Sequence, residues 1–331
     1  GHRAMIPTCD PLITLDDRLA VDDALRLGHV ALGPEVERFE QAVARVVSKR
    51  YAVATSSGSA ALHVAAKVVP WKFAVRVPAL TFIATAEAVV HAGLSMDIVD
   101  HGAPADISVN FYGHSPIGAA TIEDACEGLG AAPFGLAAIT CLSFNGNKIV
   151  TTGGGGMALT NDPMLARRMR DLVTHDRDPG IEYRHASLAH NYRMPALNAA
   201  LGLSQIARLD ALVATKRRIA AYYRTRLEGR HLSPILEPPG TFSTYWMPVF
   251  LLDREAAPVI AALQAEGIGA RAVWYPLHRQ PWFRGTATCP VADDIHRRGI
   301  ILPCSLGITE EEQEQVVQAV RRGVAAVAPA S

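Results

Sequence analysis

Lys148 is the residue whose setting most strongly indicates chemistry in this sequence. It stands alone in SFNGNKIVTTGGGGMAL (143–159), between an apolar run and four consecutive glycines. A lysine held in a dry site has a lowered pKa and becomes a usable amine nucleophile, although a lone lysine is more often a solvated loop residue. The lysine precedes the glycines, which excludes a P-loop. Residues 157–160 are typical of a strand, which excludes a dinucleotide fingerprint because its glycines open a helix.

Two more stretches place polar residues at the ends of predicted strands, where open α/β sheets bind ligands. In TSSGSAAL (55–62), small hydroxyl residues and Gly58 open an Ala-rich helix whose N-terminus favours an anion. An ordinary serine N-cap is the alternative for this stretch. In TIEDACEG (121–128), Asp124 ends an apolar strand, where a carboxylate needs a cationic partner. A helix N-cap is again the alternative.

Taken together, the three stretches fit one ligand, pyridoxal 5'-phosphate (PLP). The helix N-terminus would hold its phosphate, Lys148 would bond to its aldehyde carbon, and Asp124 would pair with its protonated pyridine nitrogen. That last pairing keeps the ring an electron sink. The order of phosphate site, aspartate and lysine along the chain also suits the large PLP-binding fold.

The elements that must position these residues read as an α/β protein. Strands are predicted at 51–55, 73–77, 96–100, 107–111, 119–123, 137–144 and 156–160, and helices at 59–69, 82–91 and 163–173. Strands that alternate with helices predict a mixed, mostly parallel sheet of the seven-stranded type, covered on both faces. The N-terminal forty residues read as helical.

The second half of the chain has a different pattern. Residues 196–228 predict one long helix or two joined ones. A smaller α+β region follows, with strands at 244–252 and 271–275, a helix at 255–266, and a last helix at 309–327 that opens with a capping box. We expect a large PLP-binding domain over 1–208 and a small C-terminal domain over 209–331.

The composition narrows the class of partners. Of 331 residues, 49% are apolar, and the formal net charge is zero. This favours neither nucleic acid nor an anionic membrane as a partner. The five cysteines are scattered and form no CxxC pair, which predicts free thiols in a reducing cytoplasm and no metal site.

A resemblance to a known family sharpens this interpretation. The sequence resembles the DegT/DnrJ/EryC1/StrS family of PLP-dependent sugar aminotransferases, of fold type I. The ordered motifs that carry the resemblance are GPEVERFE (33–40), AVATSSGSAALH (52–63), VPALTFIATAEAV (77–89), IEDACEGLGA (122–131), SFNGNKIVTTGGGGMALTND (143–162), HNYRMPALNAALGLSQIARLD (190–210), YPLHRQPWF (275–283) and LPCSLGITEEE (302–312).

The resemblance implies roles at the cofactor. Lys148 would hold it covalently and later shuttle a proton between the amino donor and the cofactor. Asp124 would bind the pyridine nitrogen, and Phe82 would stack on the ring. The phosphate would be bound by Gly58, Ser59 and Ser143.

The resemblance also implies contacts beyond the cofactor ring and between subunits. Asn191 would reach the phosphate of the neighbouring subunit's cofactor, so the active site would be shared in a homodimer. Tyr275, His278 and Arg193 are candidates for the substrate. Glu127 stands near the cofactor's phenolic oxygen, where the family often has Gln or His, so its carboxyl should be protonated or turned away.

Lys148 separates the aminotransferases of the family from dehydratases that carry histidine at this position. We therefore expect an aminotransferase that uses glutamate and a nucleotide-linked sugar, aminating C4 of a 4-keto-6-deoxy hexose in polysaccharide or antibiotic biosynthesis. A transaminase for a cyclitol or another antibiotic-precursor ketone, and a non-catalytic regulatory relative, are the alternatives. One departure is a segment between Asp100 and Ile122 that is short by about one crossover element.

Overall fold

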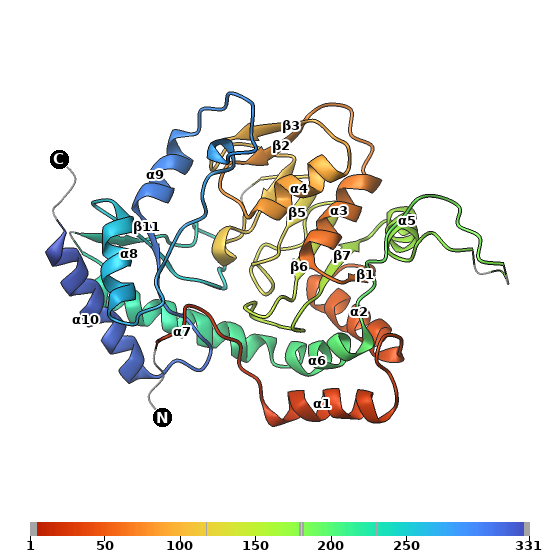
Figure 1. Cartoon of the computed structure of the whole chain (residues 1–331), viewed down its shortest axis with the longest axis horizontal. Coiled ribbons are helices and arrows are strands. Elements are labelled where there is room, and N and C mark those ends of the chain that lie inside the picture. Colours follow the sequence, from red (N-terminus) through yellow and green to blue (C-terminus); the bar gives the residue numbers. More distant parts are fainter. Residues whose placement is uncertain (1–4, 117, 179, 181, 230, 328–331) are drawn as a thin grey trace.

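The structure is a computed structural model that describes residues 5–116, 118–178, 180, 182–229 and 231–327. Its N-terminal helices are α1 (Leu15–Arg26) and α2 (Pro34–Val47). A capping box between Thr14 and Asp17 opens α1, and Pro34 occupies the first turn of α2. In Figure 1, α1 lies along the outside of α6 (Ala196–Ile206), and α6 also packs on α2.

The first half of the chain forms a central five-stranded sheet. Its order is β1 (Tyr51–Thr55), β7 (Gly156–Thr160), β6 (Ile139–Ser143), β5 (Ile122–Asp124), β4 (Ile107–Val109). Strand β7 runs antiparallel to both neighbours, and β4, β5 and β6 are mutually parallel. A parallel pair, β2 (Val75–Pro78) and β3 (Met96–Val99), adjoins β4, where the backbone N–H of Asp106 donates to the carbonyl of Arg76.

Both faces of this sheet are buried, as the alternation along β1 illustrates. Val53 packs in a core with α3 (Gly58–Val68), α4 (Ile83–His91) and α5 (Pro163–Val173). Ala52 and Ala54 point to the opposite face, into a core with α2 and α6. Since side chains alternate along a strand, one short apolar run serves two layers. The predicted mixed, mostly parallel sheet covered on both faces is confirmed.

The C-terminal half begins with α7 (Leu209–Leu227). A second, antiparallel sheet follows in the order β10 (Arg271–Ala272), β11 (Gly299–Ile301), β9 (Val249–Leu252), β8 (Leu232–Pro234). Helices α8 (Ala256–Ala265), α9 (Pro290–Arg298) and α10 (Glu310–Ala326) complete it, with short 3-10 turns at Leu277–Arg279 and, in the first half, Phe111–Gly113. Figure 1 shows α7 leading from α6 into this half. The boundary at 208/209 falls between α6 and α7 and stays a prediction.

Some elements differ from their predicted bounds. The stretch predicted as a strand at 244–252 is regular only from Val249, because Tyr245 has a φ of 48° that breaks a strand. Helix α9 and strands β8 and β11 were not predicted; each is short. The described part of the connection from β4 to β5 holds a 3-10 turn and no α-helix. Among the described residues, no helix is both long and apolar enough to cross a membrane.

Candidate active site

A cavity of about 520 Å³ lies where several strand ends meet. Strands β1, β5 and β6 end there, and β7 begins there, since Gly156 pairs with both Thr55 and Ser143. Antiparallel β7 therefore brings its glycine run to the edge at which its neighbours finish. This places the polar residues of three separate sequence motifs in one cavity, as expected for an open α/β sheet.

One wall of the cavity is the N-terminus of α3. Ser57 caps the helix by accepting a hydrogen bond from the Ala60 N–H at 3.1 Å, and Ser57, Gly58 and Ser59 line the cavity. A Cβ on Gly58 would lie 2.8 Å from the Cβ of Ser143, closer than real contacts. The missing side chain thus leaves the free N–H groups of an eleven-residue helix open to the cavity. This arrangement fits the phosphate of PLP.

Asp124 forms a second wall. Its side chain is buried, and its oxygens accept hydrogen bonds from the Thr85 hydroxyl at 2.6 Å and the Cys126 N–H at 3.3 Å. Thr85 is itself 2.6 Å from the hydroxyl of Thr81. Among the described residues, no lysine or arginine pairs with this carboxylate, and it lines the cavity. A buried anion with neutral partners on the protein side fits a protonated ring nitrogen on the other.

Lys148 reaches into the cavity between two groups. Its Nζ lies 3.3 Å from Oε1 of Glu127 and 3.8 Å from the centre of the Trp246 ring. The lysine side chain is 13% exposed and that of Glu127 is 6% exposed. The amine is therefore held in a largely dry place, as its apolar sequence context predicted.

The surroundings of Glu127 favour the protonated form of its carboxyl. Burial raises the pKa of its carboxyl to about 8, and the neighbouring charge of Lys148 only partly offsets this. Its other oxygen accepts the backbone N–H of Tyr112 at 3.0 Å. The carboxyl is turned toward Lys148, so a proton can be held between these two groups at neutral pH.

Aromatic residues that sequence reasoning missed close the cavity. Tyr112 is stacked between Trp274, at 4.3 Å between ring centres, and Trp246, at 5.9 Å. Its backbone is left-handed, with φ 49°. Gly113 follows it because a Cβ there would lie 2.7 Å from the backbone nitrogen of Trp246. The three rings come from separate parts of the chain, so no local sequence pattern indicates that they stack together.

The cavity gathers all the predicted cofactor residues except Asn191. Those that line it are Gly58, Ser59, Phe82, Asp124, Glu127, Ser143 and Lys148. Phe82 is 55% exposed at the start of α4, so its ring face is free for a planar ligand. The chemistry of these residues fits PLP, and their individual contacts with it stay predictions.

The remaining predicted residues lie outside the cavity in this chain. Asn191 is exposed beside Thr174, whose carbonyl is 3.4 Å from the guanidinium of Arg193. Tyr275 is half-exposed and packs edge-on against His296. The buried ring of His278 pairs with Asp293 at 3.2 Å. Their roles toward substrate or partner subunit stay predictions.

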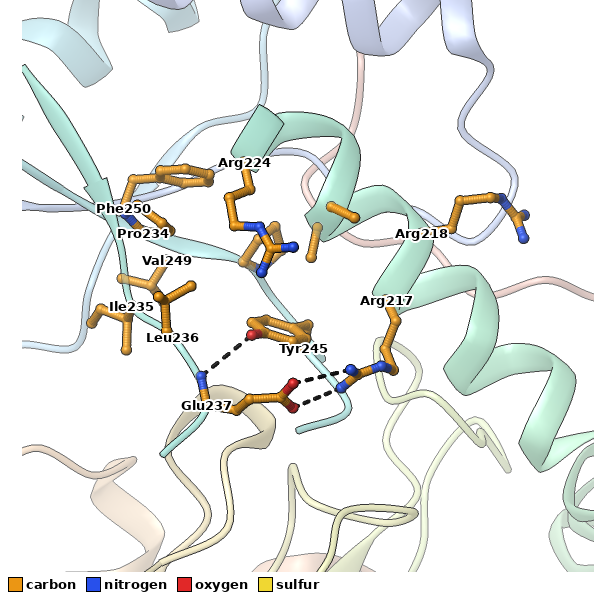
Figure 2. Close-up of a pocket in the computed structure, with 13 residues that line it drawn as sticks. Arg217, Arg218, Arg224, Pro234, Ile235, Leu236, Glu237, Tyr245, Val249 and Phe250 are labelled. Atoms are coloured by element: carbon orange, nitrogen blue, oxygen red, sulfur yellow. Dashed lines mark hydrogen bonds and ion pairs between the residues drawn. The ribbon is translucent and has the colours of Figure 1, made fainter. Parts of the chain in front are cut away.

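A smaller cavity of about 280 Å³ lies between α7 and the strands β8 and β9 (Figure 2). Arg217 and Glu237 form a two-pronged ion pair there, at 2.8 and 3.1 Å, and this holds the pKa of the Glu237 carboxyl below its usual range. The Tyr245 hydroxyl accepts the N–H of Glu237. Arg218 and Arg224 also line this cavity, and its one carboxylate, Glu237, is already bound to Arg217. Its lining residues therefore include neither a lysine amine nor an unpaired acid.

Comparison with known proteins agrees with the family that the sequence motifs indicated. The family model described as the DegT/DnrJ/EryC1/StrS aminotransferase family matches residues 11–110 and 101–321. The chain is 32% identical to EpsN of Bacillus subtilis, whose name describes a pyridoxal phosphate-dependent aminotransferase; the match covers 90% of each chain. It is also 32% identical to the GDP-perosamine synthase of Caulobacter vibrioides, with 87% of this chain and 90% of the relative covered.

Solved structures share the fold at lower identity. PseC of Helicobacter pylori, an aminotransferase in pseudoaminic acid biosynthesis, superposes with a TM-score of 0.89 at 19% identity and covers 98% of this chain and 100% of its own. The PLP form of a Streptococcus pneumoniae protein gives a TM-score of 0.89 at 21% identity, with the same coverage. At these identities, the structural similarity establishes the fold alone.

Proposed function

This chain belongs to the DegT/DnrJ/EryC1/StrS aminotransferase family, and we propose that it transfers an amino group from glutamate to C4 of a nucleotide-linked 4-keto-6-deoxy hexose. It is a PLP-dependent aminotransferase of fold type I. One observation carries the proposal: the Lys148 amine, the Asp124 carboxylate and the N-terminus of α3 line a single cavity.

The chain's own residues divide the work of the reaction. When bound, PLP supplies an electron sink that stabilises negative charge on the amino donor. Asp124 would hold the charge of the ring nitrogen, and the N-terminus of α3 would anchor the phosphate. The amine of Lys148 is free to move a proton across the cavity, because Glu127 at 3.3 Å is mostly protonated and does not fix it in a strong ion pair.

A nucleotide-linked sugar is supported by the relatives named for GDP-perosamine and by the cavity mouth. Arg271, an exposed cation, lines the cavity together with Asn145 and Asn147. A cation and two amides suit the phosphates and hydroxyls of such a substrate. The C4 position is supported by the wording SFNGNKIVTTGGGGM and NYRMPALNAALG, which resembles members that aminate C4.

A homodimer with shared sites is part of the proposal. Large apolar side chains on and around α1 are exposed in the single chain, among them Leu15 at 62%, Leu27 at 57% and Leu32 at 68%. An exposed apolar surface of this kind is typical of a protein interface. Asn191 is exposed and does not line the cavity of its own chain, which supports a role at the partner's site.

The test presents the PLP-loaded protein with glutamate and a panel of ketones. The panel contains 4-keto-6-deoxy hexoses linked to GDP, UDP or dTDP, the matching 3-keto isomers, and free cyclitol ketones. Formation of 2-oxoglutarate and the mass of the aminated product are measured. We expect turnover of a nucleotide-linked 4-keto sugar alone. Turnover confined to free cyclitols would establish the first alternative. The absence of any reaction with glutamate would favour a regulatory relative.

A further inference from the structure

A second cluster of reactive side chains lies beside the active site and has no part in the proposed chemistry. It consists of Cys9, Lys216 of α7 and Cys304, which we call the Cys–Lys–Cys cluster. The Nζ of Lys216 is 3.2 Å from the sulfur of Cys9 and 3.5 Å from that of Cys304, and it donates to the Cys304 carbonyl at 2.6 Å. The lysine is only 1% exposed.

The buried ammonium ion needs a compensating anion. Within the part of the chain that the structure describes, its contacts are two sulfurs and one carbonyl, so the anion that the cluster offers is a thiolate. The hydrogen bond from Cys304 and the charges of Lys216 and Lys148 outweigh burial and lower the pKa of Cys9 to about 6. Burial raises the pKa of Cys304 well above its ordinary value. Cys9 is thus the nucleophile, and Cys304 the protonated thiol.

One contact opposes this assignment. The carbonyl oxygen of Asn147 lies 3.2 Å from the sulfur of Cys9 and favours a protonated thiol there. The ammonium group lies at the same distance on another side and carries a full charge, whereas the carbonyl carries a partial one. At equal distance, the full charge has the stronger effect on the Cys9 sulfur.

The backbone sets the two cysteines opposite each other. The N–H of Cys304 donates to the carbonyl of Thr8 at 2.7 Å, and the N–H of Leu306 donates to the carbonyl of Asp10 at 3.2 Å. These two bonds hold the backbone on either side of Cys9 against the backbone at and after Cys304. Backbones joined in this way are roughly 5 Å apart. A disulfide requires roughly 4.4–6.8 Å. Both sulfurs contact Lys216, so both side chains point to the same side.

Access to solvent differs between the two thiols. Cys9 is partly exposed, and Cys304 is fully buried. A small oxidant therefore reaches Cys9 before Cys304, and the buried thiol of Cys304 is available for the second step. This is the arrangement of a redox-sensitive cysteine with a resolving partner.

We propose that Cys9 and Cys304 form a reversible disulfide when the protein meets a hydroperoxide. The Cys9 thiolate attacks the terminal oxygen of the hydroperoxide, the O–O bond breaks, and Cys9 becomes a sulfenic acid. The remaining oxygen of the peroxide takes up a proton and leaves as an alcohol or water. The Cys304 thiol then attacks the Cys9 sulfur, the S–S bond forms, and the sulfenic oxygen leaves as water. Two thiols are oxidised, and one peroxide is reduced.

The disulfide acts on the active site through two carbonyls. The sulfur of Cys304 lies 3.4 Å from the carbonyl oxygen of Trp246, and the sulfur of Cys9 lies 3.2 Å from that of Asn147. Trp246 covers the Lys148 amine, Asn147 precedes Lys148, and the indole N–H of Trp246 donates to the Asn147 carbonyl at 2.8 Å. Oxidation takes the proton from Cys304 and the charge from Cys9, so both contacts with this pair of residues change.

The test treats PLP-loaded protein with one equivalent of hydrogen peroxide. We expect the intact mass to fall by two hydrogens, and a non-reduced digest to contain the Cys9 and Cys304 peptides linked. Dithiothreitol should reverse the change. Cys9→Ser and Cys304→Ser should each prevent the link, whereas Cys289→Ser, which removes a buried thiol outside the cluster, should not. The proposal is overturned if Cys9 is not oxidised, or if it is over-oxidised while Cys304 remains a free thiol. It is also overturned if oxidation instead links the Lys216 nitrogen to a cysteine sulfur through an oxygen atom.

Two further measurements use the wild-type protein and need no substitution. Alkylation of Cys9 in the wild-type protein should have its pH midpoint near 6. A midpoint above 8 would remove the thiolate from the proposal. The oxidised protein should lose several-fold in transamination rate and recover it with dithiothreitol. Unchanged activity in a fully cross-linked sample would refute the coupling to Lys148.

Discussion

At the scale of single residues, the cavity sets the amine of Lys148 3.3 Å from the buried carboxyl of Glu127 and under the ring of Trp246. Lys148 and Asp124 can be recognised from the sequence alone, because a single charged residue in an apolar context is unusual. Tyr112, Trp246 and Trp274 cannot be recognised in this way, since they meet only after folding. Glu127 lies between these cases: the family resemblance marked its position, and only burial shows that it is an acid.

Glu127 should make the stability of the cofactor-free protein fall as the pH rises. Its folded pKa of about 8 lies above the ordinary value of 4.5, so the native state keeps a proton that the unfolded chain releases. Its contribution is present below pH 4.5 and is lost as the pH rises through 8, by a few kcal/mol at most. Glu127→Gln should flatten this part of the curve in urea unfolding from pH 5 to 8. Glu182→Gln, on an exposed residue, is the control. Equal slopes in wild type and Glu127→Gln would refute the protonated carboxyl.

At the scale of elements, the site exists because β7 runs against its neighbours. Its glycine run therefore arrives where β1 and β6 finish. The predicted strands and helices gave this arrangement in outline, but register and order in a sheet depend on contacts between distant segments. The close approaches of the glycines could not be assigned from the sequence for the same reason. A Cβ on Gly156 would lie 2.2 Å from the carbonyl of Ser57, whereas one on Gly154 would meet nothing within 4 Å.

These two glycines make a matched pair. Gly156→Ala should cost about 1–3 kcal/mol in unfolding free energy, because the added carbon overlaps the backbone that opens α3. Gly154→Ala should change it by less than about 1 kcal/mol. Urea denaturation measures both. If Gly154→Val weakens PLP binding or dimer assembly, the added side chain must clash with the cofactor or with the partner subunit, because nothing in its own chain lies within 4 Å. Equal destabilisation by the two alanine variants would contradict the geometry of the turn.

The capping box of α10 was predicted from sequence and is formed in full. The Thr309 hydroxyl accepts the N–H of Glu312 at 3.1 Å, and Glu312 accepts the N–H of Thr309 at 2.9 Å. Thr309→Ala should lower the unfolding free energy by about 1 kcal/mol. Thr225→Ala, at an exposed position near the end of α7, should have a smaller effect. A loss no larger than that of the control would show that α10 is held by its packing alone.

At the scale of the whole molecule, the proposed dimer can be tested by complementation. If Asn191 serves the partner's site, a Lys148→Ala chain and an Asn191→Ala chain together form one complete site in each mixed dimer. Random reassociation then restores about a quarter of the wild-type sites. Transaminase activity before and after mixing measures this. No gain on mixing, with reassociation shown by mass, would place Asn191 in the service of its own chain.

The central claim is that Lys148 is the covalent anchor and proton carrier of a PLP enzyme. The most direct measurement is the visible absorbance of purified protein given PLP, followed as glutamate is added. Wild-type protein and Lys67→Ala, which changes an exposed lysine of α3, should be yellow, lose the colour with glutamate and release 2-oxoglutarate. Lys148→Ala should form no covalent bond to PLP and show no turnover. A colourless wild-type protein that ignores PLP, or a Lys148→Ala protein that still transaminates, would contradict the account.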